Sequence, residues 1–451
     1  MSLDLGGVSQ PVKSADELVA LLRAAEKPRS AWRVGVEHEK IGLLGTAPVA
    51  YEGAAGIRAL LEGLAGAGLR VHAEDGKPIA LLSEGSSMTL EPGGQLELSG
   101  APARTLGEAR GEIERHLALV ARVSGPMGLR WLAAGYRPFG SVAGMPWMPK
   151  LRYGAMRSSL SPRGRLALDM MLMTATVQAN LDWSDEADLA EKVRAATSAS
   201  PIVSALFANS PIVAGAHSGM LDYRYQVWRE TDPARCGLLE QMVRADWGYR
   251  AYVEWALDVP LLFVRREQTY LDARGQTFRQ WLSSGQAAGV AEPPTIQQWN
   301  DHLTTLFPEA RVKSVLELRG ADAVPGPMLL SLPALWVGLL YDRDARAGAW
   351  ALTERWTFAE RLAFQAEVAR SALAARGPGG VTARELAVEL LALARQGLRS
   401  WAQVSGVDES ALLDPAEEVA RSGRTMAERA MAAWEGAGRD AEALIAFWRV
   451  A

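Results

Sequence analysis

Four stretches of the chain alternate apolar and polar residues, and their polar positions carry mostly carboxylates and amides. These stretches are 33–39, 91–99, 173–183 and 315–319. Side chains two residues apart in a strand share a face, so each stretch predicts a strand with one buried and one polar side. If the strands lie in one sheet, its polar face gathers several oxygen ligands. Such an arrangement suits Mg²⁺ and a phosphorylated substrate.

The composition of the polar face decides between a metal site and an ordinary solvated surface. For Glu37 and Glu39 alone the solvated surface is the better interpretation, because Glu is usually exposed. Solvated strand faces usually mix Lys, Thr, Ser and Arg, whereas Glu, Gln, Asn and Asp recur in these stretches with few lysines. The recurrence therefore favours the metal site, since hard oxygens hold Mg²⁺.

The remaining pattern predicts a mixture of helices and short strands. Helical spacing covers 14–26, 54–67, 105–124, 185–209 and a helical region from about 355 to the end. Two or three short strands are expected in 68–100, with a turn at Pro92-Gly93-Gly94, and another strand in 128–135. Residues 140–165 and 209–237 are expected to be irregular. Because regular βαβ alternation is missing, the expected fold class is α+β with a largely antiparallel sheet.

Bulk composition excludes several classes of protein. The chain has 451 residues, of which 49% are hydrophobic and 22% charged, as in a globular protein with a large core. The net charge of −4 argues against a general nucleic-acid-binding surface. No run approaches the roughly 20 apolar residues of a membrane span, and the first residues lack a secretory leader. We therefore expect a cytoplasmic protein without membrane or nucleic-acid partners.

Cysteine and histidine are scarce, which limits the chemistry of any site. Cys236 is the one cysteine and there are five histidines, so an intramolecular disulfide and a thiolate zinc site are excluded. Carboxylates become the natural metal ligands. Cys236 follows Arg235, but no histidine is near it in sequence, so an ordinary, partly buried cysteine is favoured over a reactive thiolate.

Anion binding would have to come from basic side chains. The Gly-x-x-x-x-Gly-Lys-Ser/Thr sequence of a phosphate-binding loop is absent. The segment 140–165 carries Lys150, Arg152 and Arg157, which suggests a lid that binds an anion, although a solvated loop is the usual alternative. Arg224, Arg235 and Arg319 can each bind a carboxylate or phosphate with two nitrogens, or pair with a structural acid.

Several longer blocks resemble the plant-type glutamate–cysteine ligases. They are Val34–Lys40, Leu90–Pro102, Met148–Lys150, Thr176–Asp182, Phe207–Pro211, Ala256–Pro260, His302–Thr305 and Leu316–Asp322. The blocks run in family order from about residue 30 to 342, and the final hundred residues match more loosely. A set of motifs this long is far more specific than one short pattern.

The resemblance implies a fold and a reaction. The fold would be a glutamine-synthetase-like curved, mostly antiparallel sheet with covering helices, a catalytic domain over 1–354, and a helical region over 355–451 packed on the same domain. The reaction would join the γ-carboxylate of L-glutamate to L-cysteine through a γ-glutamyl phosphate, consuming ATP and giving γ-glutamylcysteine, ADP and phosphate. This is the first step of glutathione synthesis. A related ligase with another amine acceptor, and a silent glutamate- or nucleotide-binding protein, stay open as alternatives.

The resemblance also implies roles for individual residues. Mg²⁺ and phosphate contacts would fall to Glu37, Glu39, Glu91, Glu97, Gln178 and Glu317. Arg235, helped by Arg224, would bind the glutamate α-carboxylate, with Asn180 nearby. Arg319 and Lys150 would neutralise the transferred phosphoryl group, and Lys150 and Arg152 would contact the nucleotide.

One departure from the plant enzymes concerns regulation. Those enzymes carry several cysteines whose disulfides control activity and dimerisation, and a single Cys236 cannot form such a switch within one chain. The sequence therefore predicts a bacterial-type member without redox control. We expect small-molecule substrates, and a monomer or a homodimer.

Overall fold

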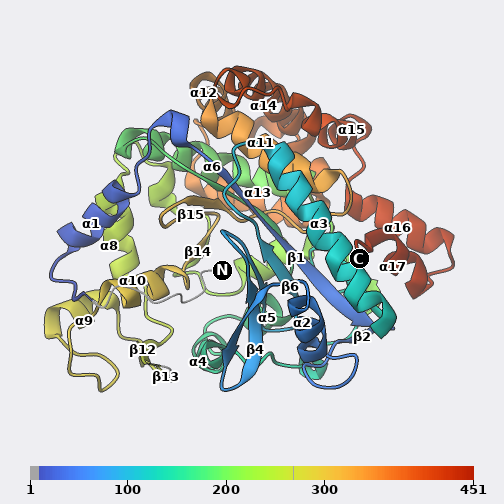
Figure 1. The fold of residues 1–451 in the computed structure, drawn as a ribbon. Helices are drawn as coiled ribbons and strands as arrows, with labels where there is room; N and C mark the ends of the chain where they lie inside the picture. The colour runs from blue at the N-terminus through green and yellow to red at the C-terminus, as the bar shows by residue number, and fades with distance from the viewer. Residues whose placement is uncertain (1–9, 268) are drawn as a thin grey trace.

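The computed structural model describes residues 10–267 and 269–451 and is built around a ten-stranded sheet (Figure 1). Eight strands lie side by side in the order β15 (Ala310–Val312), β16 (Leu316–Leu318), β8 (Val177–Leu181), β1 (Val34–Leu44), β6 (Leu96–Ser99), β5 (Ser87–Leu90), β4 (Lys77–Leu82) and β3 (Arg70–Glu74). Two more strands, β2 (Ala47–Pro48) and β7 (Leu129–Leu132), pair with the far end of β1. Neighbouring strands in this sheet run antiparallel, which confirms the predicted fold class.

The register of the central strands brings their polar positions together. Glu39 of β1 lies opposite Glu97 of β6, and Glu37 lies opposite Gln178 of β8. Glu317 of β16 faces Asn180 on the other side of β8. Because side chains alternate along each strand, these groups share one face of the sheet. The prediction of a single polar face shared by the four alternating stretches is confirmed.

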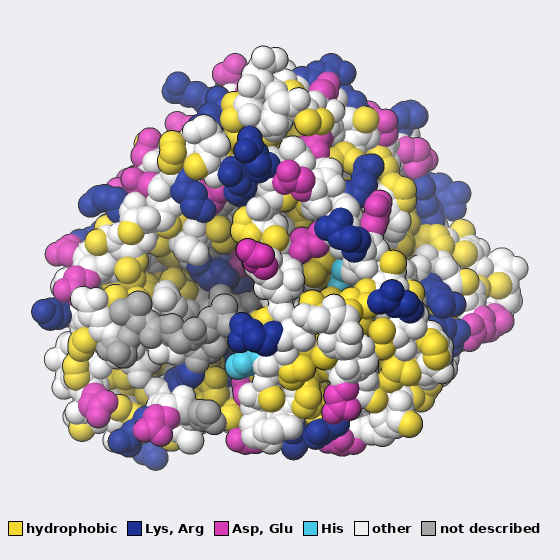
Figure 2. All heavy atoms as spheres, in the orientation of Figure 1, with side chains coloured by type: hydrophobic (Ala, Val, Ile, Leu, Met, Phe, Trp, Pro, Cys, Tyr) yellow, Lys and Arg dark blue, Asp and Glu magenta, His cyan; other side chains and the backbone are white. Residues whose placement is uncertain are grey.

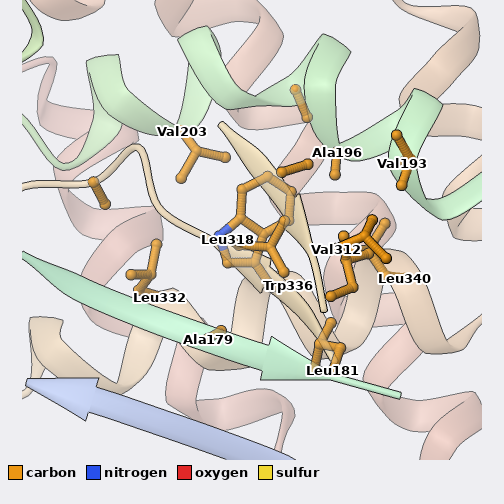
Figure 3. Close-up of a cluster of buried hydrophobic side chains, with 14 of the residues drawn as sticks. Ala179, Leu181, Val193, Ala196, Val203, Val312, Leu318, Leu332, Trp336 and Leu340 are labelled. Atoms are coloured by element: carbon orange, nitrogen blue, oxygen red, sulfur yellow. The ribbon is translucent and has the colours of Figure 1, made fainter. Parts of the chain in front are cut away.

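The opposite face is mostly apolar, apart from the buried His38 and Lys40 of β1, and is covered by helices. Behind β8 and β16 lie α6 (Glu186–Leu206) and α11 (Met328–Tyr341), and behind β4–β6 lie α2 (Ile57–Ala65) and α3 (Leu106–Ser124). Figure 3 shows Trp336 of α11 between the side chains of α6 and the strand residues Ala179 and Leu181. The residues of α11 are apolar all round, as expected of a helix buried on every side.

The remaining helices surround the polar face or extend the helical layer. Before residue 304 they are α1 (Ala15–Ala24), α4 (Leu151–Leu160), α5 (Ala167–Met173), α7 (Tyr223–Arg229), α8 (Tyr249–Asp258), α9 (Phe278–Ser284) and α10 (Ile296–Leu303). The C-terminal part contains α12 (Arg343–Ala351), α13 (Phe358–Ser371), α14 (Ala383–Ser405), α15 (Asp414–Ser422), α16 (Met426–Gly436) and α17 (Ala441–Trp448). Short two-stranded pairs join β9 (Ile212–Val213) to β10 (Ala216–His217), β11 (Cys236–Gly237) to β14 (Phe307–Pro308), and β12 (Val264–Arg266) to β13 (Thr269–Leu271).

The C-terminal helices share a hydrophobic core with the region before residue 355. Trp401 of α14 packs against Trp32, with ring centroids 6.0 Å apart, and against Tyr341 of α11 at 4.7 Å. Buried residues of both regions belong to one continuous cluster. Within the described residues, no helix combines the length and the apolar character that crossing a membrane requires.

Four local predictions were wrong. Residues 140–165 are not one loop, because Leu151–Leu160 form α4, which buries Tyr153, Met156 and Leu160 at helical spacing. The strand predicted for 173–183 starts at Val177, since the buried run before it forms α5. Residues 68–100 hold four strands instead of two or three, and α7 lies within the segment 209–237, where irregular chain was expected.

Candidate active site

A cavity opens on the polar face of the sheet, and its walls differ in chemistry. The sheet contributes the acidic and amide side chains Glu37, Glu39, Glu91, Gln95, Glu97 and Gln178. The arginines Arg152, Arg224, Arg311 and Arg319 also line the cavity. Between them lie the apolar side chains of Met156, Met170, Met171, Trp228 and Phe307. The cavity therefore combines oxygen ligands for a cation with guanidinium groups for anions.

Hydrogen bonds fix the carboxylates of β1 and β6. Asn180 Nδ2 donates to Glu37 Oε1 at 2.9 Å, and the Thr176 backbone N–H donates to Glu39 Oε2 at 3.0 Å. Thr89 Oγ1, on the neighbouring strand β5, donates to Glu97 Oε2 at 2.6 Å. Each carboxylate therefore has at least one oxygen held by a hydrogen bond, and Glu97 accepts on its second oxygen from Ser99 as well, which orients these groups in the way that partners of metal ligands do.

The turn Pro92-Gly93-Gly94 places Glu91 and Gln95 beside these carboxylates. A Cβ on Gly93 would lie 2.2 Å from the Leu172 carbonyl oxygen, and Gly94 has φ +81°, so both positions need glycine. Gln95 Nε2 donates to the Thr174 carbonyl at 2.8 Å. The Gln95 Oε1 atom is buried and has no hydrogen-bond partner among the described residues. A buried acceptor of this kind is suited to an added cation or donor.

The carboxylates Glu37, Glu39, Glu91 and Glu97 form what we call the acidic wall, and their closeness shifts their pKa values. Burial, and then the neighbouring charges of Glu91 and Glu97, raise the pKa of Glu39 well above its ordinary value. Burial and Glu97 also raise the pKa of Glu91, to about 7. Like charges this close disfavour ionisation of all members at once. The wall therefore favours a bound cation, which would compensate the charge.

Glu317 lies at the centre of a buried ion cluster. Arg311 Nη2 lies 2.6 Å from Glu317 Oε1, Lys313 Nζ lies 3.0 Å from Oε2, and Arg319 also pairs with the carboxylate. Burial acts to raise the pKa of Glu317, but these three cations hold it well below its ordinary value. Arg319 Nη1 also donates to Gln178 Oε1 at 2.9 Å. The cluster fixes Arg319 at the edge of the acidic wall.

Two further arginines present buried nitrogens to the cavity. Arg224 donates to the Gly320 and Arg319 carbonyls at 3.0 and 3.1 Å, and Arg152 Nη2 donates to Thr304 Oγ1 at 3.1 Å. The Nε atoms of Arg224 and Arg152 are buried without a hydrogen-bond partner among the described residues. Because such donors are normally satisfied, they are ready contacts for a substrate carboxylate or phosphate.

Eight of the twelve predicted site residues line the cavity, and four do not. Those outside the lining are Lys150, Asn180, Arg235 and Glu317. Asn180 and Glu317 still act on the site, because they bind the cavity residues Glu37 and Arg319. Lys150 Nζ donates to the Leu90 carbonyl, next to Glu91. The placement of Glu317 differs from the expected one, since both carboxylate oxygens face cations of the chain.

Arg235 is placed differently from the prediction of a substrate contact. Its Nε donates to Asp232 at 2.7 Å, and its other nitrogens donate to the Thr305 and Pro260 carbonyls. The side chain is fully buried, so Arg235 ties three segments of chain together. Its neighbour Cys236 is also buried, which raises the pKa of the thiol to about 12. This agrees with the interpretation of Cys236 as an ordinary cysteine.

Sequence reasoning missed several cavity residues. Gln95 is a polar position of the alternating stretch 91–99, but it was not assigned to the site. Other cavity residues lie outside the four alternating stretches and come close to them only in the folded chain. They are Arg311, Thr304, Trp228 and the three methionines. Arg311 lies on β15, directly opposite Glu317 in the hairpin with β16, and the alternating pattern around Glu317 gave no signal of this pairing.

The donor set fits Mg²⁺. Four carboxylates and two amide side chains face the cavity, and such hard oxygen donors are the ligands of Mg²⁺. In the described part of the chain, no three His, Cys, Asp or Glu side chains are already drawn together as a metal site. Mg²⁺ commonly takes only one or two protein carboxylates and completes its shell with waters and phosphate oxygens. A nucleotide-assisted metal site is therefore compatible with this cavity.

Comparison with known proteins supplies the family. The model of glutamate-cysteine ligase family 2 matches residues 33–444. The chain is 40% identical over 424 residues to "Glutamate--cysteine ligase, chloroplastic" of Nicotiana tabacum, covering 93% of this chain and 80% of the relative. The protein of the same name from Arabidopsis thaliana is 41% identical, with the same coverage.

A solved structure supports the fold independently. The glutamate–cysteine ligase of Francisella tularensis, in complex with AMP, superposes with a TM-score of 0.50 at 13% identity, over 92% of this chain and 87% of that one. At this identity the likeness concerns the fold alone. The family model covers most of the chain and the plant relatives match along nearly all of it, so the chain belongs to glutamate-cysteine ligase family 2.

Proposed function

We propose that the chain is an ATP-dependent glutamate–cysteine ligase that forms γ-glutamylcysteine, the first step of glutathione synthesis. The observation that carries the proposal is that the cavity on the polar sheet face combines the acidic wall with an arginine wall, in a chain of this family. The arginine wall consists of Arg152, Arg224, Arg311 and Arg319. The product bond requires a carboxylate to be activated, and ATP supplies the phosphoryl group that does so. Conversion of ATP to ADP and phosphate supplies the free energy needed to form the amide bond.

The acidic wall would hold Mg²⁺ with the nucleotide phosphates. Glu37, Glu39, Glu91 and Glu97 provide carboxylate oxygens, and Gln95 adds an amide oxygen that has no hydrogen-bond partner within residues 10–267 and 269–451. When bound, Mg²⁺ supplies charge neutralisation on the phosphate oxygens. The side chains that anchor these ligands, Asn180 and Thr89, keep them oriented before the substrates arrive.

The arginine wall would bind the negative groups of the substrates. Arg319 and Arg311 are fixed by Glu317 beside the acidic wall, where they stabilise charge on the transferred phosphoryl group. Arg224, with its unpartnered Nε, is the better-placed contact for the glutamate α-carboxylate. Arg152, whose Nε is also unpartnered, would contact the nucleotide phosphates.

The reaction would proceed in two steps between groups held by these walls. An oxygen of the glutamate γ-carboxylate attacks the terminal phosphorus of ATP, giving γ-glutamyl phosphate and ADP. The amine of cysteine, as the free base, then attacks the γ-carbonyl carbon and expels phosphate. The chain contributes orientation and charge stabilisation, as is usual in phosphoryl transfer. The Mg²⁺ requirement, the substrate contacts, a monomeric or dimeric state and a cytoplasmic location stay predictions.

One assay tests the function directly. ADP release is followed with ATP, Mg²⁺ and glutamate, with and without cysteine and then with a panel of other amines. We expect turnover that depends on cysteine and product of the mass of γ-glutamylcysteine. Turnover with a different amine in place of cysteine would instead identify a related carboxylate–amine ligase. No turnover with any amine would contradict the assignment as an enzyme.

A further inference from the structure

A second concave site lies on the opposite side of the sheet from the cavity. It is a groove of about 470 Å³ between α3 and the strands β4–β6, and we call it the α3 groove. Leu81, Met88 and Leu98 from the strands and Leu119 from α3 form its apolar walls. Figure 2 shows this face, with apolar surface and a small patch of histidine surface in the hollow beside α3. Its volume is in the range of pockets that bind small molecules.

The lining of the α3 groove includes a buried histidine whose ring makes no hydrogen bond within the described part of the chain. His116 is 4% exposed, and neither of its ring nitrogens has a partner among the described residues. His38 of β1 is fully buried and equally unpartnered. Buried polar groups are nearly always hydrogen-bonded, because leaving them unsatisfied costs free energy. The proposed reaction uses neither ring, so His116 is left as a polar anchor that faces the groove.

The rim of the α3 groove is acidic. Glu84 lies in the turn between β4 and β5, and Glu108 and Glu112 lie on α3, whereas Arg115 is the single basic residue of the lining. Glu108 accepts the Arg104 backbone N–H at 2.7 Å, and Glu112 accepts that of Ala101 at 2.9 Å. These bonds fix both carboxylates at the rim. The groove thus offers negative charge at its mouth, apolar walls and one neutral hydrogen-bonding ring at its floor.

We propose that the α3 groove binds a small amphipathic amine. Its apolar body would lie between Met88, Leu98 and Leu119. A hydroxyl or N–H at one end would hydrogen-bond His116, because a neutral imidazole offers one donor and one acceptor. The ammonium group at the other end would lie among the rim carboxylates. An arylalkylamine with a polar group on its ring has this order of features.

The α3 groove and the cavity share strands but not side chains. Met88 and Leu98 face the groove, while Glu97 faces the cavity and Thr89, on the same side of the sheet, donates to it. A ligand in the groove would therefore lie one sheet thickness from Glu97 without touching any residue of the proposed reaction. This separation lets the two sites be tested independently, and the groove does not depend on the proposed function.

Four matched probes test the chemistry of the groove. Tyramine carries both the phenol and the ammonium group, phenethylamine lacks the hydroxyl, 4-ethylphenol lacks the charge, and 3-(4-hydroxyphenyl)propionate reverses it. Binding is followed by NMR on protein with ¹³C-labelled histidine, because the chain has five histidines and substitution assigns each signal. We expect tyramine to shift the His116 signal saturably, and to bind about fivefold more tightly than phenethylamine. The propionate should bind most weakly.

Three variants separate binding from folding. His116→Leu should fold with an unchanged or higher melting temperature, because it removes an unsatisfied buried ring, and it should lose the preference for tyramine over phenethylamine. Glu84→Gln should weaken tyramine about twofold to fivefold without affecting 4-ethylphenol. Glu114→Gln, an exposed α3 carboxylate outside the groove, is the matched control and should change nothing.

Specific results would overturn the proposal. They are an unmoved His116 signal with all four probes at millimolar concentration, a propionate that binds as tightly as tyramine, or tyramine affinity that Glu84→Gln and Glu114→Gln leave equally unchanged. If His116→Leu fails to fold, the His116 ring is structural. The proposal is then decided by comparing the affinities of the four probes for the wild-type chain and for Glu84→Gln.

Discussion

Arg311 binds Glu317 through two guanidinium nitrogens, in a pair that is buried beneath the edge of the cavity. Nη2 lies 2.6 Å from Oε1 and Nε lies 3.2 Å from Oε2. Because Lys313 and Arg319 reach the same carboxylate, one negative charge compensates three positive ones. Glu317 is therefore better understood as the residue that positions Arg319 than as an open metal ligand.

Glu317→Gln separates these two roles. Loss of the charge removes the carboxylate with which three cations pair, so we expect the free energy of unfolding to fall by about 3 kcal/mol. Because Arg319 loses its anchor, kcat should fall about 10-fold to 100-fold. The Mg²⁺ concentration for half-maximal rate should change less than about twofold, since no metal ligand is lost. Urea unfolding and Mg²⁺ titration measure these quantities. A Mg²⁺ requirement raised by tenfold would instead identify Glu317 as a ligand.

Glu97→Gln should have the opposite effects to Glu317→Gln: the fold should keep its stability, and the Mg²⁺ requirement should rise. The amide keeps the shape of the side chain and an oxygen that accepts the Thr89 hydroxyl, so the fold should stay intact. The negative charge on the acidic wall is lost, and the Mg²⁺ concentration for half-maximal rate should rise at least about tenfold. Circular dichroism and Mg²⁺ titration of the rate test this, with Thr89→Val as a milder variant. Unchanged kinetics would refute the metal role of Glu97.

The sequence predicted the polar face because strand alternation is a local property. Glu37, Glu97, Gln178 and Glu317 follow the period of two, and the register of the sheet then places them side by side. Their hydrogen-bond partners were less predictable. Whether Glu317 would meet a metal or three cations depends on the hairpin that brings β15 back along β16, which the pattern around Glu317 does not contain.

The wrong local predictions also have physical causes. The run that forms α5 is buried on all sides, so its apolar residues show no periodicity that separates helix from strand. Helix α4 contains Gly154 and two serines, residues of low helix propensity, although Tyr153, Met156 and Leu160 have helical spacing. Arg235 looked available in sequence, and its three partners come from segments far along the chain.

Cation binding should depend on pH through Glu91. Burial and Glu97 raise its pKa to about 7, so in the metal-free protein it holds a proton that a metal ion must displace. Because the pKa of Glu91 is higher in the folded chain than its value of 4.5 in the unfolded chain, this group stabilises the fold fully at pH below 4.5. That stabilisation is lost as the pH rises through about 7. Bound Mg²⁺ should restore it above that pH.

Calorimetry in buffers of different ionisation enthalpy measures the proton released by this binding. With nucleotide present, Mg²⁺ affinity should fall as pH drops from 8.5 to 6, and proton release should be larger at pH 6 than at pH 8.5. Glu91→Gln should remove most of this difference. Affinity that is the same at both pH values in the wild-type chain would show that no protonated carboxylate is displaced.

Arg224 and Arg235 should respond differently to substitution, although both are buried arginines with backbone carbonyl partners. Arg224 lines the cavity and has an unpartnered Nε, so Arg224→Lys should raise the KM for glutamate about tenfold or more, because a lysine cannot bind a carboxylate with two nitrogens. The KM for ATP should change much less. Steady-state kinetics with each substrate varied in turn measures the contrast.

Arg235→Leu should act on stability instead. The change leaves Asp232 buried with the more distant Arg163, at 3.5 Å, as its remaining ion-pair partner, and frees the Thr305 and Pro260 carbonyls. The free energy of unfolding should therefore fall by about 3 kcal/mol, and the folded fraction should keep a KM for glutamate within about twofold of the wild-type value. Arg235→Lys, which keeps the charge, should lose less. A KM for glutamate that rises in Arg235→Lys while stability is unchanged would return the α-carboxylate to Arg235, because a purely structural arginine has no contact through which to alter substrate affinity.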